Sequence, residues 1–246
     1  ATPYTLTDGL AKLGYAMSQT GGSLLTVQKK DLSFSGLVIS SKTYDGNQNA
    51  NLSISGTSLP DKITGDLVSV SSVTGTFDTR HVGIGKTVTI TAAALTGTDV
   101  GNYTVNLNGQ GGTANINQLA SATYVGTSGG DWSNAANWAV TGNLSQTGVL
   151  PDGGNVGVAV LPSTAGGVSG AAAFTGVVST SANHAHAGKI QINGGTLSVS
   201  SDSQLGAVPS SAVADAITLN GGTLQATSGF TTSANRGLSL GASGGT

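Results

Sequence analysis

Two histidines separated by a single residue, His184 and His186, are the pair most suggestive of chemistry in this sequence. Residues two apart on a strand point to the same face, so both imidazoles could bind one metal ion. No third ligand can be assigned, because His81, Asp202 and Asp215 lie far away along the chain. The pattern favours a surface or loop pair, and we predict no metal site while leaving metal binding by this pair open.

A second candidate is the glycine-rich segment Gly83-Ile84-Gly85-Lys86-Thr87, which superficially resembles a phosphate-binding P-loop. The first glycine of the Gly-x-x-x-x-Gly-Lys pattern would fall at position 80, which is Arg80. Residues 87–90 continue as an alternating strand, where a P-loop requires a helix. The segment therefore indicates a turn that enters a strand, and we predict no cofactor.

Carboxylates are present but scattered. All 11 acidic residues are Asp and are scattered singly, and those beside Gly are explained by turn formation. Hydrolysis of a polysaccharide needs clustered carboxylates in a groove, and no Ser/His/Asp set can be proposed either. We therefore predict no catalytic residue and expect a non-enzymatic protein. An extracellular polysaccharide-degrading enzyme is the less favoured alternative.

Trp132 and Trp138 are the two tryptophans of the chain. They could form an aromatic platform for a sugar ring, which would suit a carbohydrate- or host-ligand-binding module. The favoured interpretation is structural, with both indoles buried at the first repeat of a stacked structure. The ligand-binding role of this pair is kept as the alternative.

The elements that must position these residues are predicted from composition. Only 8% of the residues are charged, no Glu is present, and Gly, Ser, Thr, Asn and Val replace the usual helix formers. The 39 glycines indicate many tight turns. The sequence therefore predicts an all-β fold. A net charge of −2 makes nucleic acid an unexpected partner, and the absence of Cys excludes disulfides.

Three regions are expected along the chain. Residues 1–30 are interpreted as the end of a preceding repeat plus a linker, because Tyr4-Thr5-Leu6-Thr7 resembles Tyr103-Thr104-Val105-Asn106. Residues 31–118 alternate strand-like runs with turns, which favours a small β-sandwich or β-grasp-like module. Tyr44 and Tyr103 stand at the two ends of this module, and we expect each ring in the core with its hydroxyl bonded to nearby backbone.

Residues 119–246 contain an internal repeat. Asn193-Gly194-Gly195-Thr196-Leu197 recurs as Asn220-Gly221-Gly222-Thr223-Leu224, with Ile190 over Ile217 and Ile192 over Leu219, at an offset of 27 residues. Such a period in strand-forming sequence is typical of a solenoid, in which the glycines turn the corners and the asparagines could stack as a ladder. We predict the first turns of a right-handed parallel β-helix.

Several motifs of the first module occur in the order of a known family. They are Lys42-Thr43-Tyr44-Asp45-Gly46-Asn47, Gly65-Asp66, Gly75-Thr76-Phe77, residues 82–88 and 95–99, Gly101-Asn102-Tyr103 and residues 113–116. This stretch resembles the YDG repeat domain. The resemblance implies a tandem module of large haemagglutinin-like adhesins secreted by Gram-negative bacteria. It assigns Tyr44, Asp45, Gly46, Asn102 and Tyr103 a structural role.

Two later stretches resemble parts of autotransporter passengers. Residues 131–138 with 151–155 resemble the opening of passenger β-helices, and residues 205–207, 219–224 and 235–238 resemble passenger-associated transport repeats. Both resemblances imply a secreted protein at the bacterial cell surface or outer membrane. The implied partners are an outer-membrane translocator, neighbouring repeats, and a host-cell surface, extracellular matrix or glycan bound by the full-length protein. The expected function is therefore that of a structural and display segment of a large surface adhesin.

Overall fold

The computed structural model describes residues 17–18, 26–164, 177–180 and 184–246. This part of the chain consists of β-strands, a few short 3-10 helices and connecting turns, and it contains no α-helix. The all-β prediction is therefore confirmed. The predicted closing strand at residues 4–7 lies outside the described residues, as does most of the predicted linker. In the described part, no helix is long and apolar enough to span a membrane.

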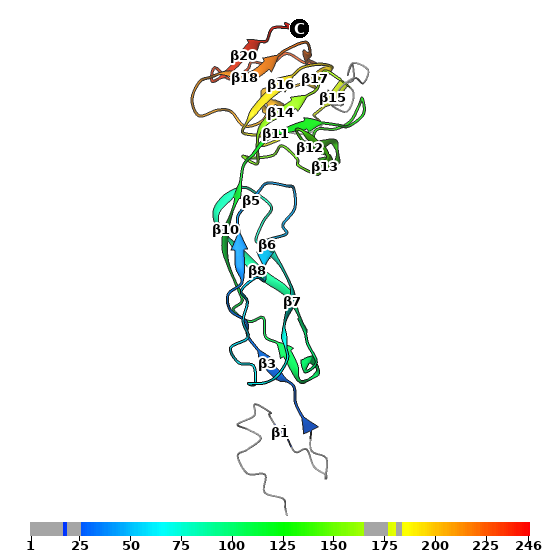
Figure 1. Cartoon of the computed structure of the whole chain (residues 1–246). Helices are drawn as coiled ribbons and strands as arrows, with labels where there is room; N and C mark the ends of the chain where they lie inside the picture. Colours follow the sequence, from blue (N-terminus) through cyan, green and yellow to red (C-terminus); the bar gives the residue numbers. More distant parts are fainter. Residues whose placement is uncertain (1–16, 19–25, 165–176, 181–183) are drawn as a thin grey trace, which may run out of the picture. The chain divides into compact units, whose positions relative to one another are not determined.

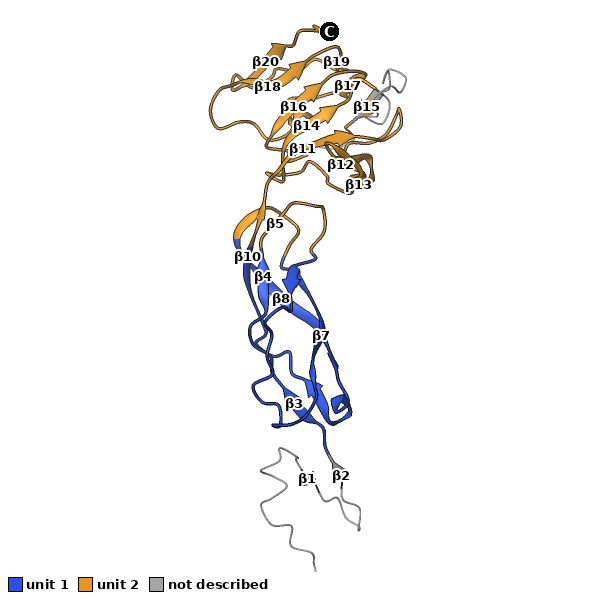
Figure 2. Ribbon diagram, in the orientation of Figure 1, with its two compact units in different colours: residues 1–40, 49–78, 85–114 blue, residues 41–48, 79–84, 115–246 orange. Residues whose placement is uncertain are grey.

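The chain divides into two compact units, coloured separately in Figure 2. Unit 1 comprises residues 1–40, 49–78 and 85–114. Unit 2 comprises residues 41–48, 79–84 and 115–246. Two short segments of the stretch that resembles the YDG repeat therefore belong to the compact unit that contains the C-terminal half of the chain.

Short strands and one long hairpin build unit 1. An antiparallel pair of two-residue strands comes first, β1 (Met17–Ser18) with β2 (Thr26–Val27). β3 (Lys30–Leu32) pairs in parallel with β9 (Tyr103–Val105), and β4 (Val38–Ser40) pairs antiparallel with β6 (Asn51–Ser53). The long hairpin joins β7 (Ser69–Phe77) to β8 (Gly83–Thr96). The sheet that contains it has the order β5-β10-β8-β7, in which β10 is Gly111–Asn117 and β5 is Lys42–Thr43. β5 and the last residues of β10 belong to unit 2.

Unit 1 has a small core, and few of its strand residues are buried. One cluster contains Leu32, Val68 and Tyr103, against which Leu59, Ile63 and Leu95 pack. The 3-10 helix η1 (Val100–Asn102) leads directly into Tyr103. On the hairpin, Phe77, Val88 and Ile90 are buried. The predicted strand at residues 87–90 thus lies inside β8, and the glycines that resemble a P-loop are at the start of this strand.

Unit 2 is built around two sheets whose strands run side by side (Figure 1). The larger has the order β13-β12-β11-β14-β16-β18-β20, and the smaller has the order β15-β17-β19. The strands of the larger sheet are β11 (Leu119–Tyr124), β12 (Trp138–Val140), β13 (Asn143–Thr147), β14 (Val156–Leu161), β16 (Lys189–Ile192), β18 (Val213–Leu219) and β20 (Arg236–Leu240). Those of the smaller sheet are β15 (Val177–Ser179), β17 (Thr196–Val199) and β19 (Thr223–Ala226). Two 3-10 helices, η2 (Ala135–Asn137) and η4 (Asp202–Leu205), lie in the connections.

The 27-residue register predicted from the sequence is confirmed in both sheets. Ile190 pairs with Ile217 and Ile192 with Leu219, all in parallel strands. Leu197 pairs with Leu224 in the same way. Of these paired positions, Leu224 is only half-buried and the others are buried. The next step of the larger sheet is shorter, because Ile217 pairs with Leu238.

Two details differ from the simple repeat. β12 and β13 pair antiparallel with their neighbours, so the larger sheet opens on a hairpin and becomes parallel only from β11 through β14 onward. The two Gly-Gly turns also differ in backbone conformation. Positive φ falls on Gly195 in the first turn (φ 64°) and on Gly221 in the second (φ 106°). The repeat therefore conserves side-chain register more strictly than turn geometry.

Candidate functional site

The turn that carries the Tyr-Asp-Gly sequence, residues 41–48 and hereafter the YDG turn, is ordered by a buried lysine. The Lys42 ammonium is enclosed and donates to Asp45 Oδ1 at 2.7 Å and to the Asn47 carbonyl at 2.9 Å. The Asn47 amide also donates to Asp45 Oδ1, which forms an Asx-type turn. Gly46 supplies the positive φ (82°) that this reversal requires. These hydrogen bonds join residues within the turn and hold its shape locally.

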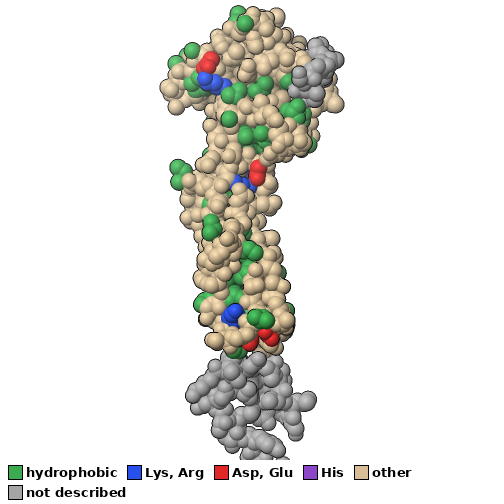
Figure 3. All heavy atoms as spheres, in the orientation of Figure 1, with side chains coloured by type: hydrophobic (Ala, Val, Ile, Leu, Met, Phe, Trp, Pro, Cys, Tyr) green, Lys and Arg blue, Asp and Glu red, His purple; other side chains and the backbone are tan. Residues whose placement is uncertain are grey.

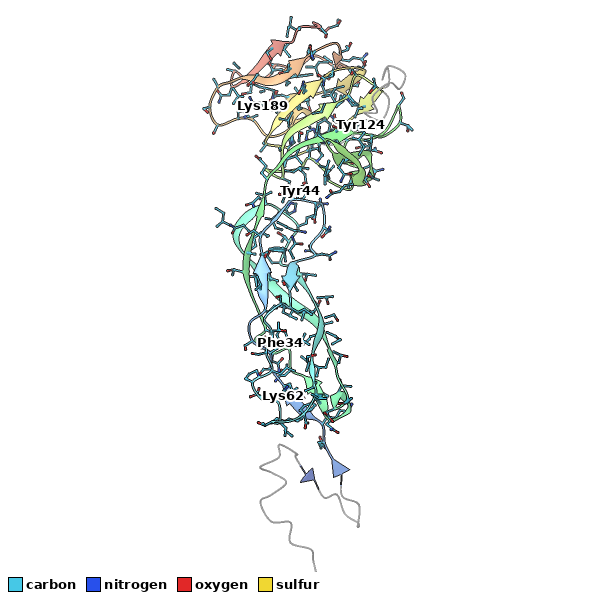
Figure 4. All side chains as sticks on the ribbon, in the orientation of Figure 1. Phe34, Tyr44, Lys62, Tyr124 and Lys189 are labelled. Atoms are coloured by element: carbon cyan, nitrogen blue, oxygen red, sulfur yellow. The ribbon has the colours of Figure 1, made fainter. Side chains whose placement is uncertain are left out.

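The Tyr44 side chain extends from this turn into the interior of unit 2, to which the turn belongs, and is only 1% exposed. Its amide donates to the Asn117 carbonyl at 2.8 Å, and its hydroxyl donates to the Leu150 carbonyl at 3.2 Å. Burial, with a smaller contribution from the negative charge of Asp152, raises the pKa of Tyr44 to about 12. The residue is labelled in Figure 4. The ring is in the core and the hydroxyl meets backbone, but that backbone is 106 residues away along the chain.

The YDG turn contacts the connection between β13 and β14. This connection comprises residues 148–155 and is hereafter called the 148–155 loop. Gly46 lies so close to it that a Cβ at this position would meet the Gly148 carbonyl oxygen at 2.1 Å. That distance is far below any van der Waals contact, so a side chain cannot be accommodated here without movement. Both the conformation and the close approach therefore demand glycine at position 46.

A second segment of unit 2, residues 79–84, reaches the same loop through side chains. Arg80 forms an ion pair with Asp152 at 2.9 Å. Asn155 is 1% exposed, and its Oδ1 accepts from the Val82 amide at 2.9 Å while its Nδ2 lies 2.9 Å from His81 Nδ1. Since Asn155 Nδ2 can only donate, His81 Nδ1 accepts and the ring proton sits on Nε2. Asn155 is therefore a buried amide whose hydrogen bonds are met mainly by this segment.

Both tryptophans lie in the core of unit 2, with Trp132 1% and Trp138 0% exposed. Trp138 Nε1 donates to the Trp132 carbonyl at 2.8 Å, and Trp132 Nε1 donates to the Pro151 carbonyl at 3.3 Å. The two rings meet edge to face at 4.5 Å, and Tyr124 contacts Trp138 in the same manner at 5.4 Å. An aromatic platform for a sugar needs an exposed ring face, and neither indole offers one.

The two histidines join this aromatic cluster. The His184 ring stacks on Trp132 at 4.6 Å with an interplanar angle of 10°, and its centroid lies 6.4 Å from that of His186. Among the described residues, neither ring nitrogen of His184 has a hydrogen-bond partner, nor does Nδ1 of His186. His186 Nε2 lies 3.1 Å from the Lys189 carbonyl. The two histidines lie in a loop, as the sequence favoured, because residues 184–187 belong to no strand.

Burial controls the protonation of these imidazoles. It lowers the pKa of His184 to about 4, helped by the neighbouring His186 and opposed by the backbone of Gln204. Burial also lowers the pKa of His186, against the opposing effects of the Lys189 backbone and Asp152. Both rings are therefore neutral at pH 7. In the described part of the chain, no group of three or more His, Cys, Asp or Glu side chains could hold a metal ion.

The other residues of the predicted motifs lie in cores, short helices or turns. Tyr103 is 3% exposed in unit 1, where its hydroxyl donates to Asp66 Oδ2 at 2.5 Å and accepts from the Ile63 amide. Asn102 is the exposed last residue of η1. Asn220 Nδ2 lies 3.5 Å from Asn193 Oδ1, at the outer limit of the predicted ladder bond. Gly194 and Gly222 are buried at the corners they turn.

Sequence reasoning missed Arg236, which is 8% exposed at the start of β20. Its guanidinium donates to Asp202 Oδ1 at 3.0 Å, to the Leu205 carbonyl at 2.8 Å and to the Gly206 carbonyl at 3.0 Å. It therefore fastens η4 and the following turn to the sheet. The sequence feature that could have indicated this role is the scarcity of arginine, because Arg80 and Arg236 are the two arginines of the chain.

Unit 2 also carries an open groove of about 410 Å³. It is lined by Gln118, Gly157, Val158, Ala187, Gly188, Lys189, Pro209, Val213 and Ala216. No carboxylate belongs to this lining, and Lys189 is paired with Asp215 at 2.6 Å. The pair of converging carboxylates that polysaccharide hydrolysis would need is not part of this groove.

Comparison with known proteins gives one match, to a family model. No curated protein and no solved structure matches the chain significantly. Residues 28–114 match the family model described as the YDG domain. This stretch contains Tyr44 and Tyr103 and includes both segments that unit 2 takes from the first half of the chain. Residues 28–114 are thus similar to YDG domains, as their motifs indicated.

Proposed function

We propose that this chain is a non-enzymatic structural and display segment of a large secreted bacterial surface adhesin of the haemagglutinin or autotransporter type. The observation that carries the proposal is the match of residues 28–114 to the YDG domain, joined to a sheet of parallel strands with a 27-residue register. Repeats of this kind stack one on the next, which suits a segment that extends and presents another part of a protein.

The use of the chemically capable side chains supports a structural role. The buried cations Lys42 and Arg236 are held by Asp45 and Asp202. The tryptophans fill a core and offer no face to a ligand. On the face seen in Figure 3, charged side chains are few and scattered among uncharged ones. Such a surface has no concentrated charge to steer a small charged substrate.

We further propose finer architectures for both halves. The parallel sheets of unit 2 form the first turns of a right-handed parallel β-helix built from passenger-associated transport repeats. The YDG-like stretch forms a small β-sandwich or β-grasp-like module. The support for the β-helix is that β14, β16 and β18 stack in parallel in one sheet while β15, β17 and β19 stack in parallel in the other.

The proposed location is the bacterial cell surface, reached by secretion through an outer-membrane translocator. The absence of Cys and the low content of charge suit a chain that crosses a membrane unfolded and folds outside. The proposed partners of the full-length protein are a host-cell surface, extracellular matrix or glycan, together with neighbouring repeats of the same chain.

Surface labelling in the source bacterium tests the location. An epitope tag is inserted after Gly109, an exposed residue at positive φ in the turn before β10, where a Cβ would meet no atom within 4 Å. We expect antibody to label intact cells and external protease to remove the label. Labelling that requires permeabilised cells would overturn the proposal. A tagged cytoplasmic protein, which must stay dark on intact cells, controls for leakage.

A further inference from the structure

The family match and the compact units disagree about where the YDG turn belongs. Residues 28–114 match one family model, yet residues 41–48 and 79–84 lie in the unit formed by residues 115–246 (Figure 2). The YDG turn bears the sequence that is most characteristic of the family-matched stretch. Its contacts within unit 2 therefore need a physical explanation.

The YDG turn meets the 148–155 loop through main-chain recognition. The Tyr44 hydroxyl donates to the Leu150 carbonyl, and the bare Cα of Gly46 lies against the Gly148 carbonyl. Neither contact depends on a side chain of the loop. A tyrosine hydroxyl and a glycine in this arrangement can thus bind any loop that has a glycine carbonyl and a second carbonyl in these positions, whatever the other side chains of the loop.

Residues 79–84 add side-chain selectivity to the same surface. Arg80 requires the Asp152 carboxylate, and the Val82 amide requires the Asn155 side-chain oxygen. A loop without Asn at this position would leave the Val82 amide without this acceptor, which disfavours such a loop. The partner is thereby specified as a loop with glycine, then an Asp and an Asn.

The receiving loop is joined to the core of unit 2 and to its first parallel strands. The Pro151 carbonyl accepts from Trp132, and the Asn155 carbonyl accepts from the amide of Leu119 at the start of β11. β14 begins at Val156, directly after the loop, and pairs with β11. The YDG turn therefore bonds to the loop that leads from β13 into β14, and β14 is the parallel neighbour of β11.

We infer that the YDG turn, with residues 79–84, is a capping surface that closes the first repeat of a following parallel β structure and is a working part of that structure. The partner it fits is a strand-connecting loop with a Gly-x-x-Pro-Asp-x-x-Asn pattern, met here at residues 148–155. Stacked repeats expose an apolar end that needs a cap, and the family-matched stretch supplies it. This inference does not require the secreted role proposed above.

Two conservative substitutions in the full chain test the inference. Tyr44→Phe removes the donor to Leu150, whereas the matched control Tyr103→Phe removes the donor to Asp66 in unit 1. Hydrogen exchange is followed by mass spectrometry. We expect Tyr44→Phe to speed exchange about fivefold in residues 119–124 and 148–161, the size of one lost hydrogen bond. Tyr103→Phe should act instead on residues 30–32 and 103–105. An effect of Tyr44→Phe confined to unit 1, or absent from residues 148–161, would overturn the inference.

A pair of glycine substitutions provides a stronger perturbation. Gly46→Ala introduces a Cβ that clashes with the 148–155 loop. In Gly56→Ala, in unit 1, the alanine must adopt a similar positive φ (88°), but its Cβ meets no atom within 4 Å. Fluorescence emission from the two tryptophans, both in unit 2, reports whether the YDG turn contacts the 148–155 loop, because Trp132 donates a hydrogen bond to the Pro151 carbonyl of that loop. We expect a red shift and a lower unfolding temperature of that signal for Gly46→Ala only. Equal shifts for the two variants would contradict the capping role.

Discussion

Unit 1 and unit 2 use strands in different ways. The long hairpin of unit 1 buries only Gly75, Phe77, Val88 and Ile90 along β7 and β8, so most of its side chains face solvent. In unit 2, β16 and β17 bury every second residue, and each buried side chain has a partner in register on the neighbouring strand. Unit 1 therefore depends on a few anchors, whereas unit 2 depends on continuous stacking.

The polar groups of the two units follow the same contrast. In unit 1 the Tyr103 hydroxyl bonds to the Asp66 carboxylate, so one side chain satisfies another. In unit 2 the Tyr44 hydroxyl and the Arg236 guanidinium bond mainly to main-chain carbonyls of connecting loops. A stacked sheet leaves many turn carbonyls to be satisfied, and rare long polar side chains are placed to satisfy them.

The largest effect is expected from Arg236→Ala. It leaves Asp202 without its partner and strips two buried carbonyls of a donor, which costs about 3–5 kcal/mol of unfolding free energy for a buried pair. The matched control is Lys189→Ala, whose pair with Asp215 is about half exposed, so that its loss should cost far less unfolding free energy. Urea unfolding followed by tryptophan emission measures both. Similar costs for the two variants would mean that the buried clamp is not a major anchor of unit 2.

The same truncation placed in each core compares the two modes of packing directly. Leu197 and Leu32 are both fully buried. Leu197 lies between Val178 and Leu224 in adjacent parallel strands, so its neighbours cannot close the cavity without breaking register. We expect Leu197→Ala to cost about 4 kcal/mol and Leu32→Ala about 2–3 kcal/mol, because the smaller core of unit 1 can collapse. Chemical unfolding that ranks them in the opposite order would break the comparison.

Acid should weaken unit 2 selectively. His184 and His186, whose pKa values are both lowered by burial, belong to unit 2. The folded pKa of His184, about 4, lies below the ordinary value of 6.5, so the unfolded chain binds the proton more readily between these values. Stability is therefore fully present above pH 6.5 and falls as pH drops toward 4, by about 3 kcal/mol from this residue.

His184→Phe is the control for this acid response. The substitution keeps a ring stacked on Trp132 and removes two buried nitrogens that have no partner among the described residues. We expect the unfolding temperature at pH 7 to rise slightly and the acid sensitivity to shrink. The charges that bear on His184, from His186, Arg236 and Asp131, are unchanged in this variant. If added metal raised the unfolding temperature of the unmodified chain but not that of His184→Phe, the result would instead favour a metal ion bound by the two histidines.

The smallest effect is expected at high pH. The pKa of Tyr44, about 12 in the folded chain, exceeds its ordinary value of 10, so the unfolded state loses the proton first. The stability that Tyr44 contributes is therefore present below pH 10 and is lost as the pH rises toward 12. Thermal melts across this range should show a shallower alkaline loss for Tyr44→Phe. An unchanged slope would indicate that Tyr44 ionises freely.

Sequence periodicity predicted unit 2 better than unit 1. The pairing of Ile190 with Ile217 was readable because stacking of repeats places equivalent residues in register. The partners of Tyr44 and Arg236 were not readable, because Leu150 and Leu205 offer only backbone carbonyls, which every residue has. The stacking of His184 on Trp132 was also hidden, since it joins a loop to the core across 52 positions of the chain.

Native-state hydrogen exchange on the unmodified chain tests the contrast between the units most directly. Residues in β14, β16 and β18 have parallel neighbours on both sides, whereas β4 and β6 form an isolated pair with no buried residue. We predict that the slowest amides of the described chain lie in β14, β16 and β18 and that those of β4 and β6 exchange far faster. Equal protection in these two groups, or slower exchange in β4 and β6, would contradict the account.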